Sequence, residues 1–434
     1  MDVIENIALP QSEQHILLLK YMLVLAYMIF IPYLALLFGS LLNSLYIKSK
    51  SQNGKGNIGF ETIKFLTFNR LAPIGFGIVP FLSIQFIYIQ LLQSSGIKFG
   101  WIAVIIFILL FISIILIYLY KHYFALSILF QEKIDNEESN SIIESLVKPT
   151  SDFKKFGKYA FIILSIAIYL FFGLVNFLSN SANWESGFLS SLIQTKSILN
   201  FISFLFLSLL LSNSFIIWNN HKAKEKYFPS EFSSLLAKIS MIASLILPAL
   251  LLVDSLLTST KSLSYDYFIF TFLAIATILI LTNLFYKDVK EVSFTNSNLI
   301  IFFSFIFILL SIVREQYAFG TNIQLHSQKL SQNYVEYQNK LNAELGINVV
   351  VVSGADIFNG KCIACHNFDK KIVGPAYKDV LPKYEGKMQD LIKFVLNPIK
   401  VNPDYPSMPN QGLKPNEAEA IAEYIMNTYV EKYK

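Results

Sequence analysis

Eight long stretches of apolar residues with almost no charge follow one another along most of this chain. They cover residues 16–46, 72–95, 99–120, 159–179, 198–218, 236–258, 267–286 and 298–313. A run of about 20 apolar residues is long enough to cross the hydrocarbon core of a bilayer as a helix. The eight runs therefore predict an all-α fold that contains a polytopic bundle of eight transmembrane helices.

The overall composition agrees with a membrane protein. Hydrophobic residues make up 54% of the 434 residues and charged residues 15%, against roughly 45–50% and 25% in an average soluble domain. The net charge of +5 comes mostly from lysines between the runs, so it does not indicate a nucleic-acid partner. The first fourteen residues are acidic and lack the basic region and cleavage site of a signal peptide. We expect the first span to be retained and to target the chain.

Lysine and arginine are distributed unevenly between the connections. The connections after spans 2, 4 and 6 contain three such residues, Lys98, Lys196 and Lys261. The connections after spans 1, 3, 5 and 7 contain sixteen: Lys48, Lys50, Lys55, Lys64, Arg70, Lys121, Lys133, Lys148, Lys154, Lys155, Lys158, Lys222, Lys224, Lys226, Lys287 and Lys290. Short basic loops stay in the cytoplasm. We therefore expect both termini on the periplasmic side of a bacterial inner membrane.

The segment Cys362-Ile363-Ala364-Cys365-His366 holds the two cysteines of the chain. Cys-x-x-Cys-His is typical of covalent haem c attachment, in which the thiols bind the porphyrin and the histidine is the proximal iron ligand. A structural zinc site needs four Cys or His ligands, and three lie close together here. A thioredoxin-like pair needs a βαβ pattern, which the sequence lacks. We expect one haem c held by Cys362, Cys365 and His366.

The composition changes after the last apolar run. Residues 314–346 are polar, with apolar residues spaced as on one face of a helix, at Leu325, Leu330, Tyr334, Tyr337 and Leu341. We therefore predict three parts: a transmembrane domain over residues 1–313, a helical connector over 314–352 and a haem domain over 353–434.

The haem domain resembles the class I c-type cytochromes over roughly the last eighty residues. Several pieces occur in the order of that family: Gly354-Ala355-Asp356-Ile357-Phe358, the haem motif, Gly374-Pro375, Asn397-Pro398, Tyr405-Pro406-Ser407-Met408-Pro409 and a last helix from Asn416 to Tyr429. The resemblance implies a small all-α domain, a Gly374-Pro375 turn whose proline packs on His366, and Met408 as the distal iron ligand.

Two other methionines of the domain are alternatives to Met408. Met388 lies in an expected helix and Met426 in the last one, and both are better interpreted as core residues. A thioether opposite an imidazole raises the potential of haem iron and leaves it without an open position. We therefore expect no catalytic residue in this domain. The predicted function is transfer of single electrons between a membrane redox complex and a terminal acceptor.

The residues of the apolar region indicate its role less clearly than those of the haem domain do. His15, His122, His221 and His326 all fall at span ends or in connections, which argues against a b-type haem between facing helices. Asp254, Asn176, Gln85 and Gln90 lie within the predicted spans. Polar groups there are candidates for function, although hydrogen bonds between helices also explain them.

The layout of eight spans followed by a cytochrome resembles that of the membrane-bound urate hydroxylases, a likeness of architecture without a shared motif in residues 1–313. It implies an alternative function, an oxidoreductase whose helices bind a quinol or small substrate and pass its electrons to the haem. The predicted partners are the lipid membrane, redox proteins and, in this alternative, quinone.

Overall fold

The computed structural model describes residues 11–50, 56–67, 69, 71–136, 153–223, 230–345, 353–403 and 405–433. The elements of this part of the chain are helices and loops, with no strand, so the predicted all-α class is confirmed. The chain forms two compact units, Met1–Tyr337 and Gln338–Lys434. This division falls inside the helix α13 (Gln324–Glu344), whereas the three-part division at residues 313 and 352 remains a prediction.

The first unit contains eight helices, among the described residues, that are long and apolar enough to span a membrane. This confirms the predicted bundle. The second span joins a π-helical segment, η1, to α3; Pro80 lacks the amide hydrogen that a regular helix would use there. The spans are α1 (Glu13–Lys50), η1 (Pro73–Ile78) with α3 (Val79–Leu91), α4 (Gly100–Asn136), α6 (Phe153–Ser179), α9 (Thr195–Lys222), α10 (Ser230–Leu257), α11 (Tyr265–Glu291) and α12 (Ser297–Asn322).

Shorter elements connect or extend the spans. They are α2 (Gly56–Leu66), α7 (Asn183–Ser186), α8 (Phe188–Ile193), η2 (Thr260–Ser262) and α13 (Gln324–Glu344). The last of these contains the apolar residues from Leu325 to Leu341 of the predicted connector, and Leu330 buries its side chain. Helix α11 begins at an N-cap, where the Ser264 hydroxyl accepts a hydrogen bond from the Tyr267 amide at 3.2 Å.

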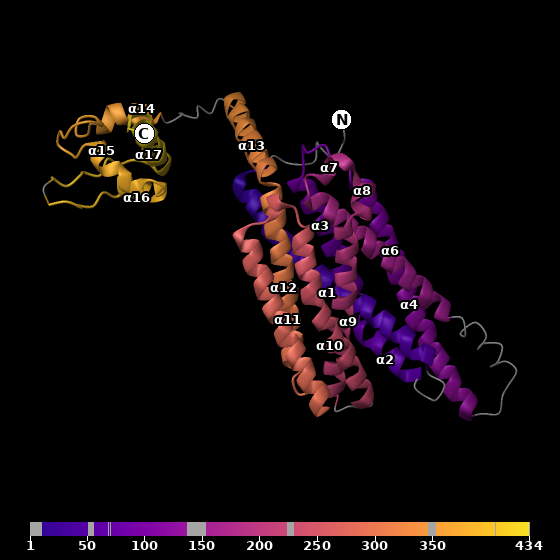
Figure 1. The fold of residues 1–434 in the computed structure, drawn as a ribbon. Coiled ribbons are helices and arrows are strands. Elements are labelled where there is room, and N and C mark those ends of the chain that lie inside the picture. The colour runs from indigo at the N-terminus through magenta and orange to yellow at the C-terminus, as the bar shows by residue number, and fades with distance from the viewer. Residues whose placement is uncertain are drawn as a thin grey trace. The chain divides into compact units, whose positions relative to one another are not determined.

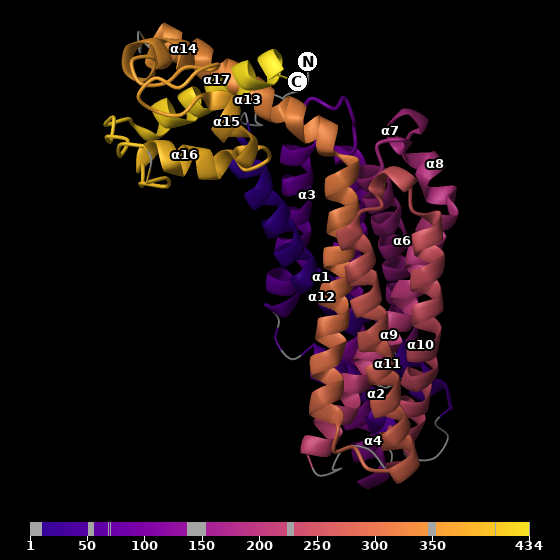
Figure 2. The same cartoon turned by 60° about the vertical axis from the view of Figure 1, so that its left-hand side comes forward.

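The long helices of the first unit lie side by side (Figures 1 and 2). Neighbouring pairs include α4 with α6, α9 with α10, α11 with α12 and α1 with α9. A Cβ atom at Gly39 of α1 would overlap the Ser212 side chain and the Ser208 carbonyl of α9. Small residues of this kind let helix backbones approach closely in membranes, where packing drives association. Beside this contact, Asn43 Nδ2 donates to Asn213 Oδ1 at 2.8 Å.

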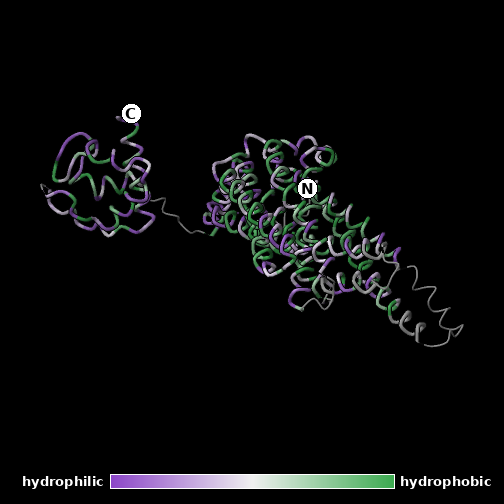
Figure 3. Tube along the Cα trace, turned by 60° about the horizontal axis from the view of Figure 1, so that its bottom comes forward, coloured by the Kyte–Doolittle hydropathy of each residue, from purple (hydrophilic) through white to green (hydrophobic). Residues whose placement is uncertain are grey.

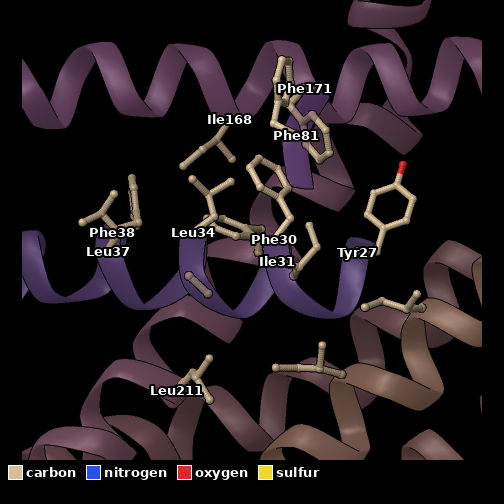
Figure 4. Packing of buried hydrophobic residues seen from close by; sticks show 14 of the residues in the cluster. Tyr27, Phe30, Ile31, Leu34, Leu37, Phe38, Phe81, Ile168, Phe171 and Leu211 are labelled. Carbon is tan, nitrogen blue, oxygen red and sulfur yellow. The ribbon is translucent and has the colours of Figure 1, made fainter. Parts of the chain in front are cut away.

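Aromatic side chains fill the interior of the bundle. Figure 4 shows Phe30, Phe81 and Phe171 grouped beside α1; the Phe30 ring lies 5.1 Å from that of Phe171 and 5.9 Å from that of Phe81, centroid to centroid. The outer surface is apolar too, since Phe86 and Val104 are each 56% exposed. Figure 3 shows the hydrophobic colour continuing along these helices. A surface of this kind suits lipid as its solvent.

Two helices are longer than the sequence predicts. Helix α12 continues to Asn322, so Arg314 lies in the last span and not in the connector. Helix α4 continues to Asn136, so His122 lies inside a helix and not at its end. His15 lies in the first turn of α1, His221 in the last turn of α9 and His326 in α13.

Most of the polar residues predicted within spans are engaged in hydrogen bonds. Asn176 Nδ2 donates to Gln194 Oε1 at 2.9 Å and to Ser197 Oγ at 3.0 Å. Gln11 donates to Gln90 Oε1 at 2.6 Å. Gln85 is buried, and its Oε1 atom accepts no hydrogen bond from the described part of the chain. Asp254 takes part in an ionic cluster and is treated below.

The second unit is small and helical. Its elements are α14 (Gly354–Ile357), the π-helical η3 (Phe358–Cys362), α15 (Tyr377–Val380), η4 (Leu381–Tyr384), α16 (Met388–Leu396) and α17 (Pro415–Tyr433). Ser353 caps α14 by accepting a hydrogen bond from the Asp356 amide at 3.2 Å. The core lies between these helices and contains Phe358, Leu381, Leu391, Val395, Ala418, Ile421, Ala422, Ile425, Met426 and Tyr429.

The first and last helices of this unit cross in close contact. A Cβ atom at Gly354 would overlap the Ala420 carbonyl oxygen and come within 2.6 Å of Tyr424 Cβ. One turn further, the Phe358 and Tyr424 rings lie 5.7 Å apart. Phe358 is the first residue of the short helix that ends at Cys362. Its contact at the crossing therefore holds the start of the Cys-x-x-Cys-His segment against α17.

Candidate haem site

The Cys-x-x-Cys-His segment folds into a tight turn at the end of η3. The Cys365 and His366 amides both donate to the Cys362 carbonyl, at 3.1 and 2.9 Å. Both cysteines are free thiols; Cys362 is 7% exposed and Cys365 is half-buried. Burial raises the pKa of the Cys362 thiol. The turn therefore places two thiols and an imidazole close together.

The His366 ring is oriented by the predicted Gly374-Pro375 turn. Its Nδ1 atom lies 3.2 Å from the Pro375 carbonyl oxygen, and because a carbonyl can only accept, Nδ1 carries the proton. Nε2 then keeps its lone pair, which is the arrangement that metal-bound histidines show. A Cβ atom at Gly374 would come within 2.8 Å of His366 Nδ1. A residue without a side chain is therefore required beside the ring.

The Tyr377 ring stacks on the His366 ring. The two ring centroids are 5.0 Å apart, with an angle of 7° between the planes. Burial lowers the pKa of His366 and raises that of Tyr377. Sequence reasoning missed Tyr377; the signal available was its position two residues after Pro375.

A cavity of about 480 Å³ lies beside His366. Its lining is mainly apolar and comes from α15, η4, α16 and the loop that follows. Met408 lines the same cavity as His366. Of the two alternative methionines, Met426 is buried in the core and Met388 packs against that core, and neither lines the cavity. The loop of residues 405–409 thus brings Met408 to the histidine.

The donors and the cavity fit a covalently held haem. An imidazole whose Nε2 is available and a thioether line one largely apolar space, and the two free thiols lie in the turn that leads to the imidazole. This is the set of donors that haem c requires. Haem c supplies one-electron chemistry at its iron. Pro375, Leu381, Leu391 and Val395 are among the residues that would cover the macrocycle.

Comparisons with known proteins agree with this site. A family model described as Cytochrome c matches residues 351–428. Cytochrome c-551 of Pseudomonas denitrificans is 40% identical over 79 residues, which are 17% of this chain and 95% of that protein. Cytochrome c-552 of Nitrosomonas europaea is 37% identical over 70 residues, 15% of this chain and 67% of that protein. Cytochrome c-552 of Hydrogenobacter thermophilus is 38% identical over 71 residues, which are 15% of this chain and 70% of that protein.

No solved structure matches the chain. The matched residues all lie in the second compact unit and include the haem motif and Met408. The membrane bundle is therefore joined to a haem c electron-transfer domain, and through that C-terminal domain the chain belongs to the cytochrome c family, in its class I form.

Proposed function

We propose that this protein is a membrane-bound monohaem cytochrome that passes single electrons between a membrane redox complex and a terminal acceptor. The observation that carries the proposal is the shared cavity of His366 and Met408. With an imidazole on one side of the iron and a thioether on the other, no coordination position is open to a substrate. Such a site exchanges electrons and does not transform a bound molecule.

The residue roles follow from this arrangement. Cys362 and Cys365 would hold the haem covalently, and His366 and Met408 would bind its iron. Gly374 leaves room for the histidine ring, and Pro375 accepts the hydrogen bond that orients it.

An exposed apolar patch beside the haem motif supports a protein redox partner. Ile363, Ile372 and Val373 are 46%, 44% and 48% exposed, and the Val373 amide donates to the Cys365 carbonyl at 3.3 Å. Lys361, Lys370, Lys371 and Lys378 are all exposed around it. An apolar contact with a basic border suits transient docking of an acidic partner, since the charges guide the encounter.

The lysine distribution supports the proposed orientation. The connections after the odd-numbered spans contain sixteen basic residues and those after the even-numbered spans three, which favours a cytoplasmic location for the odd-numbered connections. With eight spans, both termini and the haem domain then lie on the periplasmic side of a bacterial inner membrane.

Removal of Met408 tests the electron-carrier assignment. The full-length reduced protein should be six-coordinate, low-spin and unreactive toward carbon monoxide. Met408→Ala should open one position on the iron, lower the reduction potential and allow carbon monoxide to bind. A pyridine haemochrome assay should give one covalent haem per chain in both proteins.

Met426→Ala is the matched control, because it removes the same side chain from the core. It should leave carbon monoxide binding absent and cost about 2–5 kcal/mol of domain stability, as large-to-small core changes do. Carbon monoxide binding to the unmutated protein, or to Met426→Ala in place of Met408→Ala, would overturn the assignment.

A further inference from the structure

A buried ionic cluster lies at one end of the bundle. Arg314 Nη2 on α12 donates to Asp254 Oδ2 on α10 and to Glu315 Oε1, each at 2.5 Å. Lys196 Nζ, in the first turn of α9, lies 3.9 Å from Asp254 Oδ1 and 3.8 Å from Glu315 Oε2. Arg314 and Asp254 are 4% and 3% exposed. Ionisable groups inside membrane spans are costly and usually have a function.

Several polar atoms of this cluster lack a hydrogen-bond partner among the residues that the structure describes. Arg314 Nε and Nη1 are donors without an acceptor, whereas Asp254 Oδ1 and Gln316 Oε1 are acceptors without a donor. Leaving such atoms buried and unpaired costs free energy, and each instance calls for an explanation. All three residues line one cavity. The unpaired donors and acceptors point to a polar group that belongs in this cavity.

The rest of the cavity is shaped for an aromatic ring. Its volume is about 170 Å³, similar to the cavity of about 150 Å³ that holds benzene in another protein. Phe171, Phe204 and Phe307 are among its apolar walls. The hydroxyls of Tyr27 and Tyr88, which also line it, are hydrogen-bonded to each other at 3.0 Å. The Tyr27 and Phe171 rings lie 6.3 Å apart, centroid to centroid, and both are labelled in Figure 4.

The charges of the cluster define the ligand further. Arg314 and Lys196 balance Asp254 and Glu315, so the four side chains carry no net charge and favour a neutral ligand. A carbonyl oxygen can accept from Arg314, and a hydroxyl in the same place can donate to Asp254 or Gln316. The site therefore suits an oxygen atom that accepts a hydrogen bond when its molecule is oxidised and donates a hydrogen bond when its molecule is reduced.

We propose that this cavity binds the ring of a neutral quinone and of its reduced quinol. A quinone combines a six-membered ring, opposed oxygens that change between carbonyl and hydroxyl, and solubility in the lipid that surrounds the bundle. The inference goes beyond the proposed function, because binding in the bundle does not depend on how the haem iron is ligated.

Binding of duroquinone, a single-ring quinone without a tail, tests the proposal directly. Equilibrium dialysis of the full-length, haem-loaded protein in lipid nanodiscs should show saturable binding after subtraction of empty nanodiscs. Val175→Phe, which fills the cavity from α6 without touching the charges, should raise the dissociation constant at least tenfold. Arg314→Gln should do the same.

Asp254→Asn distinguishes recognition from a merely structural role. It removes the carboxylate that accepts from the quinol, so it should weaken durohydroquinone binding more than duroquinone binding. A cluster that only holds the helices together would affect both forms equally, and that result would overturn the proposal.

Two controls lie at other places in the bundle. Asp288→Asn alters a buried carboxylate near the opposite end of α11, where it accepts from Asn296 at 2.7 Å. Leu36→Phe reduces a second cavity of about 900 Å³. Both should leave duroquinone binding within twofold of the unmutated protein. Loss of binding in Leu36→Phe but not Val175→Phe, or saturable binding of urate in place of duroquinone, would overturn the assignment.

The carbon monoxide test of Met408 is independent of these measurements. If Met408 is the axial ligand and duroquinone does not bind, the electron-carrier function stands and the quinone site falls.

Discussion

Gly354→Ala should destabilise the haem domain by more than any gain in helix propensity can offset. The new methyl group would overlap the Ala420 carbonyl oxygen and lie 2.6 Å from Tyr424 Cβ, where ordinary contacts are 3.4–4 Å. The Ala420 atom belongs to the backbone, so α14 and α17 must separate. Overpacking of this kind costs about 1–3 kcal/mol, and alanine returns about 1 kcal/mol at most relative to glycine in a helix.

With the full return from alanine the expected net loss reaches about 2 kcal/mol, a factor of up to roughly 30 in the ratio of folded to unfolded domain. Guanidinium unfolding of the full-length protein, followed by haem absorbance, measures it as a lower midpoint with an unchanged slope. Gly360→Ala is the control, because nothing lies within 4 Å of the added atom, and it should be neutral or stabilising by up to about 1 kcal/mol. Equal midpoints for the two variants would refute the close crossing of α14 and α17.

Two further predictions concern the surroundings of the haem site. Gly374→Ala would bring a methyl group within 2.8 Å of His366 Nδ1, so the imidazole must move. We therefore expect an altered absorption spectrum of the reduced haem. An unchanged spectrum together with an unchanged unfolding midpoint would contradict this packing. Asp369 accepts hydrogen bonds from Lys432 and Tyr433 at 2.5 Å, which lower its pKa below the ordinary 3.8. A depressed carboxyl pKa stabilises the fold above its unfolded value and loses that effect as the pH falls through the folded value. Asp369→Asn should therefore lower the unfolding midpoint slightly at neutral pH and progressively less in acid below pH 3.8, whereas a pH-independent difference would show that the pairing is unimportant.

The parts that could be predicted from the sequence depend on local chemistry. The eight spans were predictable because lipid requires a continuous apolar run, and the haem motif was predictable because covalent attachment needs two thiols and an imidazole at fixed spacing. The connector helix followed from the spacing of its apolar residues, and α13 covers Gln324–Glu344. Met408 could be distinguished from Met388 and Met426 by family resemblance, and its position in the cavity with His366 supports that choice.

The ionic cluster could not be predicted for two physical reasons. The apolar run ends at residue 313, and an arginine next to a polar stretch is typical of a span end. Helix α12 nevertheless continues to Asn322, because backbone hydrogen bonds do not require lipid around them. Arg314 also finds its partner Asp254 60 residues away, on a helix whose position depends on tertiary packing. Periodicity within one segment carries no information about such a pair.

The pairing of Arg314 with Asp254 also limits how the bundle can move. It joins α12 to α10, and the ion pair of Lys196 with Asp254 connects α9 to the same two helices. Separating these helices would leave a buried charge without its counterion, at a cost of about 3–5 kcal/mol. An arrangement opened at this end would then be populated at only about one part in 10² to 10⁴. A transporter that works by rocking two halves apart needs both arrangements within easy thermal reach, so the cluster marks this end of the bundle as a fixed clamp and not as a gate.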